Sequence, residues 1–242
     1  MFRIIKVAGL TFFLGLQIYL FLIRKYDCLD LNIYPNTNPT YFICNNHSVG
    51  QTFKAPQNNL HRIDLMFGTY NRTNELKIYF QLWEIRGKRK ILVRQSEFRA
   101  TEVKNNLYHK IKFNPISQSK GKLYYFSLSS PDSSPETGIS AWMNERNIYR
   151  HGNYVFDGRE KRGDLVFRTY SYHNLVSCLW RITRHYPGFL GSKLFFYFVL
   201  TFFEAISLFM FYFLLHQFLF FLEKGNQPSK NSKAKLEGQR FT

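Results

Sequence analysis

Apolar residues concentrate near the two ends of the chain, whereas the central region alternates between apolar and polar residues. Residues 4–23 form a nearly uninterrupted apolar run, and residues 194–222 form a longer one. A helix of about twenty residues, rising about 1.5 Å per residue, crosses a hydrocarbon core of about 30 Å. The pattern therefore predicts one transmembrane helix within residues 1–25 and a second within residues 191–223.

A cleaved signal peptide is the alternative interpretation of the first run. Signal peptides have a shorter apolar core, of about 7–15 residues, followed by a small-residue cleavage site. Here Arg24, Lys25 and Tyr26 follow the run. This sequence favours a retained membrane anchor.

The central region, residues 50–170, shows the period of two that is typical of strands with one buried face. Ile63, Leu65 and Phe67, for example, alternate with Arg62 and Asp64. Turn-forming Gly, Asn, Pro and Ser residues separate the alternating segments. About eight or nine short strands without intervening helices predict an all-β sandwich flanked by two transmembrane helices, with the jelly roll as the favoured variety.

The segments that flank this region have different patterns. Residues 26–49 are rich in Asn, Pro and Thr and predict an irregular connection. Residues 171–190 carry apolar residues at helical spacing, which predicts a juxtamembrane amphipathic helix with Trp180 at the level of the lipid headgroups. A helix packed beneath the sandwich is an equally open alternative. Residues 224–242 are rich in Lys, Ser and Gln and predict a disordered tail.

Two transmembrane helices place both termini on one side of the membrane, and the basic tail favours the cytoplasm. We therefore expect a two-pass protein of the cytoplasmic (inner) membrane, with the sandwich in the periplasm or outside the cell. Cys28 and Cys44 would then lie in an oxidising compartment and can form a disulfide. Two free thiols are the alternative, and both remain open.

Several motifs in the central region carry a resemblance to a known family. They are residues 51–53 (QTF), 59–64 (NLHRID), 68–74 (GTYNRTN), 113–116 (FNPI), 119–122 (SKGK), 124–131 (YYFSLSSP) and 163–168 (GDLVFR). They resemble galactose-binding-like jelly-roll modules of bacterial membrane-anchored envelope proteins, as found attached to some membrane glycosyltransferases. The resemblance implies a non-catalytic envelope module of β-sandwich type, for which carbohydrate is one ligand class.

The sequence contains no recognisable catalytic or metal-binding motif. The 7 histidines are scattered, and no pair has the spacing of a zinc site. Nucleophile elbows, phosphate-binding loops and dinucleotide-binding motifs are also absent. We therefore expect a protein that is not an enzyme and that uses neither a metal nor another cofactor.

A sugar site needs exposed aromatic rings beside polar side chains. The best candidate is the segment around residues 142–154, whose ligand-binding candidates are Trp142, Asn144, Arg146, Tyr149 and Tyr154. The alternative is that Trp142 belongs to the core and that the remainder is an ordinary surface loop.

The chain carries a formal net charge of +17. Residues 50–170 contain about ten more basic than acidic residues, which favours anionic lipid headgroups, acidic polysaccharides or an acidic protein as partners. A generally solvated basic surface is the alternative. Nucleic acid is not an expected partner for an exported domain.

Glu204 lies inside the second apolar run. An ionisable group in hydrocarbon costs several kcal/mol unless it is paired or neutral. We expect Glu204, with Gln17 of the first run, to contact an integral-membrane partner protein or an ion path. The alternative is a protonated Glu204 carboxyl that bonds to the backbone or to Gln17.

These features together predict a non-catalytic accessory or scaffold subunit of a larger membrane complex. The alternative is a membrane-tethered carbohydrate-binding module that acts in envelope polysaccharide assembly or export. A hydrolase with an unrecognised carboxylate pair is the third class considered.

Overall fold

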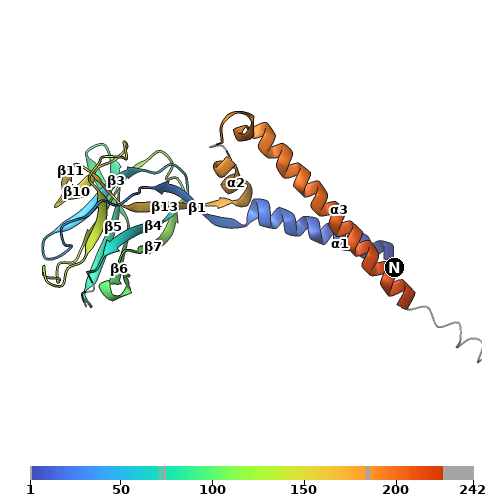
Figure 1. Cartoon of the computed structure of the whole chain (residues 1–242), viewed down its shortest axis with the longest axis horizontal. Coiled ribbons are helices and arrows are strands. Elements are labelled where there is room, and N and C mark those ends of the chain that lie inside the picture. Colours follow the sequence, from blue (N-terminus) through green and yellow to red (C-terminus); the bar gives the residue numbers. More distant parts are fainter. Residues whose placement is uncertain (1, 71, 73–74, 184–185, 226–242) are drawn as a thin grey trace, which may run out of the picture. The chain divides into compact units, whose positions relative to one another are not determined.

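The computed structural model describes residues 2–70, 72, 75–183 and 186–225 (Figure 1). It divides into two compact units: Lys25–His173 contains the strands, and the helices lie before and after this range. The predicted tail at 224–242 falls almost entirely outside the described residues.

The strands pair in two antiparallel sheets. The first has the order β1-β13-β4-β9-β12, with β2 on β9 and β7 on β4; the second has the order β11-β10-β3-β8-β5-β6. Their bounds are β1 Lys25–Asn32, β2 Asn38–Pro39, β3 Ser48–Lys54, β4 Leu60–Gly68, β5 Lys77–Arg86, β6 Arg89–Arg99, β7 Tyr108–Ile116, β8 Leu123–Ser129, β9 Ser140–Asn144, β10 Tyr154–Phe156, β11 Arg159–Lys161, β12 Asp164–Leu165 and β13 Phe167–Asn174.

One apolar core joins the two sheets. Ile63, Leu65 and Phe67 of β4 are fully buried, as their alternation predicts. From the second sheet, the rings of Phe53 and Phe126 lie 5.8 and 5.5 Å from the ring of Phe167 in the first. The predicted antiparallel two-sheet architecture is therefore confirmed, while the jelly-roll variety remains a prediction.

The prediction of an irregular connection at residues 26–49 is wrong. This segment contributes β1, β2 and the start of β3, and Ile43 forms an isolated antiparallel bridge with Ile139. The strand unit therefore spans Lys25–His173 rather than residues 50–170. β1 is an edge strand that joins its sheet through backbone pairing with β13, so it does not need a continuous apolar face.

The helical unit contains two helices that are long and apolar enough to cross a membrane, at Ile4–Ile23 and Lys193–Lys224. The first consists of α1 (Phe2–Ile18) and a π-helical turn, η1 (Tyr19–Ile23); the second is α3 (Lys193–Gly225). A short helix, α2 (Leu175–Thr183), and a 3₁₀ turn, η3 (Gly188–Gly191), belong to the same unit. Trp180 of α2 packs against Phe196 of α3, with ring centroids 5.5 Å apart.

α1 and α3 pack antiparallel, so that the start of α1 lies beside the end of α3 (Figure 1). Phe13 stacks on Phe211 at 4.1 Å, and the Gln17 amide donates a hydrogen bond to the Ser207 hydroxyl. One turn earlier, a Cβ added at Gly9 would lie 3.0 Å from the side chain of Leu215. Contacts at every fourth residue indicate that an i, i+4 ridge of α1 packs into a groove of α3. Gly9 allows the two helices to approach most closely.

The predicted pair of Cys28 with Cys44 does not form. Cys44 is a free thiol and is 2% exposed, whereas Cys28 and Cys178 are disulfide-bonded. The Cys44 side chain points inward beside Gly138, whose added Cβ would lie 3.1 Å from the Cys44 Cβ. An oxidising compartment allows disulfides but does not determine which cysteines form them.

Candidate functional site

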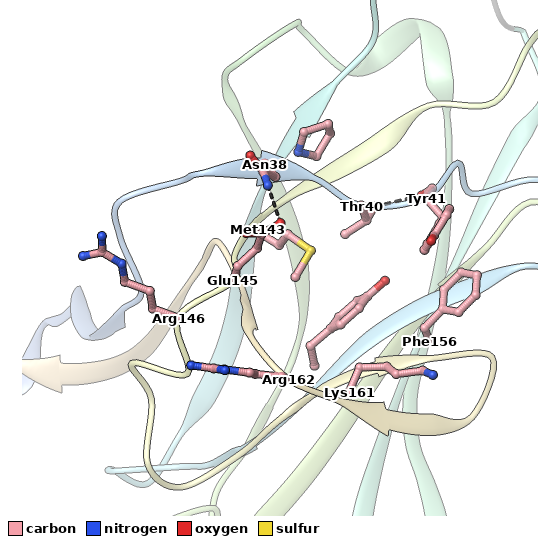
Figure 2. Close-up of a pocket in the computed structure, with 11 residues that line it drawn as sticks. Asn38, Thr40, Tyr41, Met143, Glu145, Arg146, Phe156, Lys161 and Arg162 are labelled. Atoms are coloured by element: carbon pink, nitrogen blue, oxygen red, sulfur yellow. Dashed lines mark hydrogen bonds between the residues drawn. The ribbon is translucent and has the colours of Figure 1, made fainter.

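An open cleft of about 1070 Å³ lies where β2 and the end of β9 face β10 and β11 (Figure 2). It therefore collects residues from both sheets and from four separate stretches of the chain. Its lining residues are Asn38, Pro39, Thr40, Tyr41, Met143, Glu145, Arg146, Tyr154, Phe156, Lys161 and Arg162.

The charged side chains of the cleft are mostly basic. Arg146, Lys161 and Arg162 line it together with one acidic residue, Glu145, which accepts a hydrogen bond from Asn38. In Figure 2, Arg146 and Arg162 lie toward one end of the cleft and Lys161 lies toward the other. The cleft therefore favours an anionic ligand that is long enough to reach both ends.

Aromatic rings form one wall of the cleft. Tyr41 is 72% exposed, and its ring lies 4.9 Å from that of Phe156. Phe156 stacks on His47 at 5.4 Å, and His47 Nδ1 lies 2.8 Å from Asp157 Oδ2. Asp157 also accepts the backbone N–H of Ser48, so the ring on which Phe156 rests is itself fixed. An exposed ring held on a rigid support can stack on the apolar face of a ligand.

Tyr154 contributes a buried hydroxyl to the lining of the same cleft. The residue is 4% exposed, and its hydroxyl has no hydrogen-bond partner among the described residues. Burial raises the pKa of Tyr154, so the phenol is neutral and can both donate and accept. A buried hydroxyl without a partner is costly, and a polar ligand atom would satisfy it.

Asp164 fixes the loop that carries Arg146. This carboxylate is fully buried and accepts the backbone N–H groups of Ile148 and Tyr149, each at 2.8 Å. It also accepts a hydrogen bond of 3.0 Å from the Gln51 amide. Burial raises the pKa of Asp164, against the opposing effect of these three donors. The loop is therefore held to the core by a buried acceptor.

Two of the five predicted ligand-binding residues line the cleft: Arg146 and Tyr154. Asn144 does not, because its amide donates to the Pro35 carbonyl and its oxygen accepts the Arg146 N–H. Tyr149 is 8% exposed, and its hydroxyl bonds to the backbone of Lys54.

Trp142 lies outside the cleft lining. It is half-buried, and its indole N–H donates to Asn106 Oδ1 at 2.9 Å. Of the predicted ligand-binding residues, Trp142, Asn144 and Tyr149 therefore support the fold, whereas Arg146 and Tyr154 line the cleft.

Sequence reasoning missed Tyr41, Phe156, Lys161 and Arg162. Phe156 could have been predicted from its spacing of two residues from Tyr154 on β10, since alternate residues of a strand lie on the same face. The signal for the cations is the short basic hairpin that follows. No sequence pattern indicates that Tyr41 lines the cleft, because it lies in the segment 26–49 that the sequence predicts to be irregular.

A second polar cluster, on β1 and β4, serves the fold. Asp27 lies 3.0 Å from His61 Nε2 and also pairs with Arg62, which reaches Asp64 at 2.9 Å. His61 has no residue in register on β7 or β13, so it forms a bulge. The bulge lets His61 and Arg62 reach the same carboxylate.

The two predicted intramembrane contact residues, Gln17 and Glu204, line one cavity of about 450 Å³ in the helical unit. Its other walls are mostly apolar, with Phe21, Leu200 and Phe203 among them. Gln17 donates to Ser207 at 3.1 Å. Within the described part of the chain, the observed hydrogen bond of Gln17 is to Ser207 and not to Glu204.

Among the described residues, no group of three or more His, Cys, Asp or Glu side chains is placed to hold a metal ion. No protein-family model matches the chain, and no curated protein matches it in sequence. The resemblance to galactose-binding-like modules therefore stays a prediction.

Proposed function

We propose that the chain is a non-catalytic accessory subunit of a larger membrane assembly, anchored by the α1–α3 hairpin. The observation that carries this proposal is the polar lining of the intramembrane cavity. Glu204 and Gln17 line a cavity within helices whose outward side chains are largely apolar and exposed. Ionisable groups within a membrane span almost always face other helices or a polar cavity rather than lipid, and a partner helix supplies such a surface.

The antiparallel packing of α1 and α3 supports a two-pass topology, because it places both chain ends on the same side. The disulfide-bonded state of Cys28 and Cys178 supports an oxidising compartment for the strand unit. We therefore infer cytoplasmic termini and a periplasmic or extracellular strand unit, in the cytoplasmic membrane of a cell with an envelope.

Purification from the native membrane in a mild detergent tests this proposal. We expect a partner protein to co-purify at a fixed stoichiometry through size-exclusion chromatography. A chain that elutes alone from several mild detergents, with its disulfide intact, would contradict a subunit role.

The second candidate is a membrane-tethered module that binds an acidic glycan, and the cleft favours it. Three basic side chains, an exposed tyrosine ring and the buried Tyr154 hydroxyl line it. The jelly-roll variety belongs to this candidate, and the sheet order β10-β3-β8-β5, in which neighbours are not consecutive in the chain, supports it.

Binding to acidic and neutral polysaccharides tests the second candidate. Arg162→Gln should weaken binding of the acidic polymer about tenfold, because a charged contact in a cleft is lost. The matched control is Lys120→Gln, which removes an exposed charge outside the cleft lining. Equal binding by both variants would remove the cleft from consideration.

A further inference from the structure

We propose that the cavity beside Glu204 receives a basic side chain from a membrane-spanning helix of a partner protein. This inference rests on the proposed subunit function and specifies the chemistry of the contact. It follows from acceptor groups that have no observed donor, from the size and lining of the cavity and from its depth.

Two acceptor groups of the cavity have no observed donor, although the Thr183 and Ser207 hydroxyls also line it and Thr183 donates to the Trp180 carbonyl. The Gln17 amide nitrogen is used by Ser207, but the Gln17 carbonyl oxygen is buried and has no partner among the described residues. Gln17 is 8% exposed, so this oxygen is removed from solvent. The Glu204 carboxyl lines the same cavity and forms no ion pair within the described part of the chain. A donor with a positive charge would satisfy both groups.

The helix geometry explains why the cavity exists. α1 and α3 touch at four-residue intervals through Gly9, Phe13 and Gln17. After Gln17 the first helix changes to the π-helical turn Tyr19–Ile23, which breaks the regular spacing of the ridge. Phe21 of this turn lines the cavity. π-helical turns within α-helices are frequent at functional sites.

The size and lining of the cavity fit a long side chain with a polar end. Its volume of about 450 Å³ far exceeds that of one water molecule, about 30 Å³. Phe21, Leu200 and Phe203 can pack against the methylene stem of a lysine or arginine. The polar end then reaches Gln17 and Glu204.

The depth of the site favours a partner helix over a lipid headgroup. Gln17 lies six residues inside the end of the first span at Ile23, and Glu204 lies eleven residues after Lys193. At about 1.5 Å per residue these distances are about 9 and 16 Å, well within a hydrocarbon core of about 30 Å. Lipid headgroups lie outside this core, whereas a basic residue in a membrane-spanning helix is already at that depth and needs an acidic partner.

Charge-dependent co-purification of the full-length protein tests the inference. We expect Glu204→Gln to reduce recovery of the stoichiometric partner about tenfold or more, because one member of a buried charge pair is removed. Glu204→Asp should retain much of the recovery. Glu223→Gln, which removes an exposed acidic group of the same helix, is the matched control and should behave like the wild type. The partner should carry Lys or Arg within a membrane span, and its replacement by Met should cause the same loss.

Protection of the buried Cys44 thiol from maleimide verifies that the strand unit of each variant is folded, and the helical circular-dichroism signal verifies the helices. Full recovery of the partner by Glu204→Gln would overturn the cavity inference and leave the subunit proposal standing. A wild-type chain that recovers no partner would overturn both. A photo-reactive residue introduced at Leu200 that labels only lipid, or only a second copy of this chain, would also overturn the inference.

Discussion

Replacing Asp164 by alanine should destabilise the strand unit, because the Asp164 carboxylate is a buried acceptor for three hydrogen-bond donors. The buried Tyr149 N–H loses its partner, and the buried Gln51 amide loses one of its two acceptors and keeps the Thr52 carbonyl. The Ile148 N–H lies in a more exposed residue and can reach water. Each buried donor left without a partner costs about 1–3 kcal/mol. We therefore expect the free energy of unfolding to fall by about 2–5 kcal/mol.

The free thiol of Cys44 provides the assay in the intact membrane protein. It is 2% exposed and is the only free cysteine of the three, so its reaction with a maleimide requires the strand unit to open. A loss of 2–5 kcal/mol corresponds to labelling that is about 30-fold or more faster, since each 1.4 kcal/mol is about tenfold. Asp164→Asn should show an intermediate increase, because the amide keeps one acceptor oxygen.

Asp132→Ala is the matched control, since Asp132 is an exposed carboxylate of the same unit. It should label at the wild-type rate. If Asp164→Ala labelled within about twofold of wild type, Asp164 would not hold the loop, and the assigned support for Arg146 would be wrong.

Three further outcomes are expected. Gly9→Leu should weaken the α1–α3 hairpin by about 1–3 kcal/mol in an SDS titration followed by circular dichroism, because Leu215 occupies the space, whereas Gly15→Leu, where nothing lies within 4 Å, should not. Burial lowers the pKa of His61 below 6.5, so the unfolded chain binds more protons than the folded chain and stability is lost as the pH falls below about 6.5. His61→Gln should reduce this loss, measured as the pH dependence of Cys44 labelling. An unchanged pH profile would contradict the assignment. Denatured, non-reduced protein should bind one maleimide per chain and three after reduction, and two additional free thiols before reduction would contradict the disulfide.

The sequence pattern predicted the strands that bury one continuous face. β5 alternates between buried and more exposed residues, because one of its sides faces the shared core. β4 places Ile63, Leu65 and Phe67 on that core, although its other face is also largely buried. β1 could not be predicted in this way, since it pairs at a sheet edge and buries little more than Cys28. Strand propensity and the period of two indicate which residues are buried. An edge strand depends more on backbone hydrogen bonds to its neighbouring strand, which these patterns do not reveal.

The cleft illustrates the same limit at the level of the site. Arg146 and Tyr154 were predicted because they follow a strand end and carry suitable chemistry. Tyr41 lies more than one hundred residues earlier in the chain, and the pairing of β2 with β9 brings its segment to the cleft. Such non-local pairing has no signature in a single sequence. The Asn144 side chain donates to a backbone carbonyl and does not line the cleft, and no sequence pattern indicates this.

The central claim is that two helices anchor the strand unit on the outer side of one membrane. Cysteine accessibility in sealed right-side-out vesicles tests it most directly, with Lys120→Cys in the strand unit and Lys224→Cys at the end of α3. A membrane-impermeant maleimide should label Lys120→Cys in intact vesicles and Lys224→Cys only after permeabilisation, while the buried native Cys44 stays unlabelled. Labelling of Lys224→Cys in intact vesicles with Lys120→Cys protected, or release of the protein from the vesicles by alkaline washing, would contradict the account.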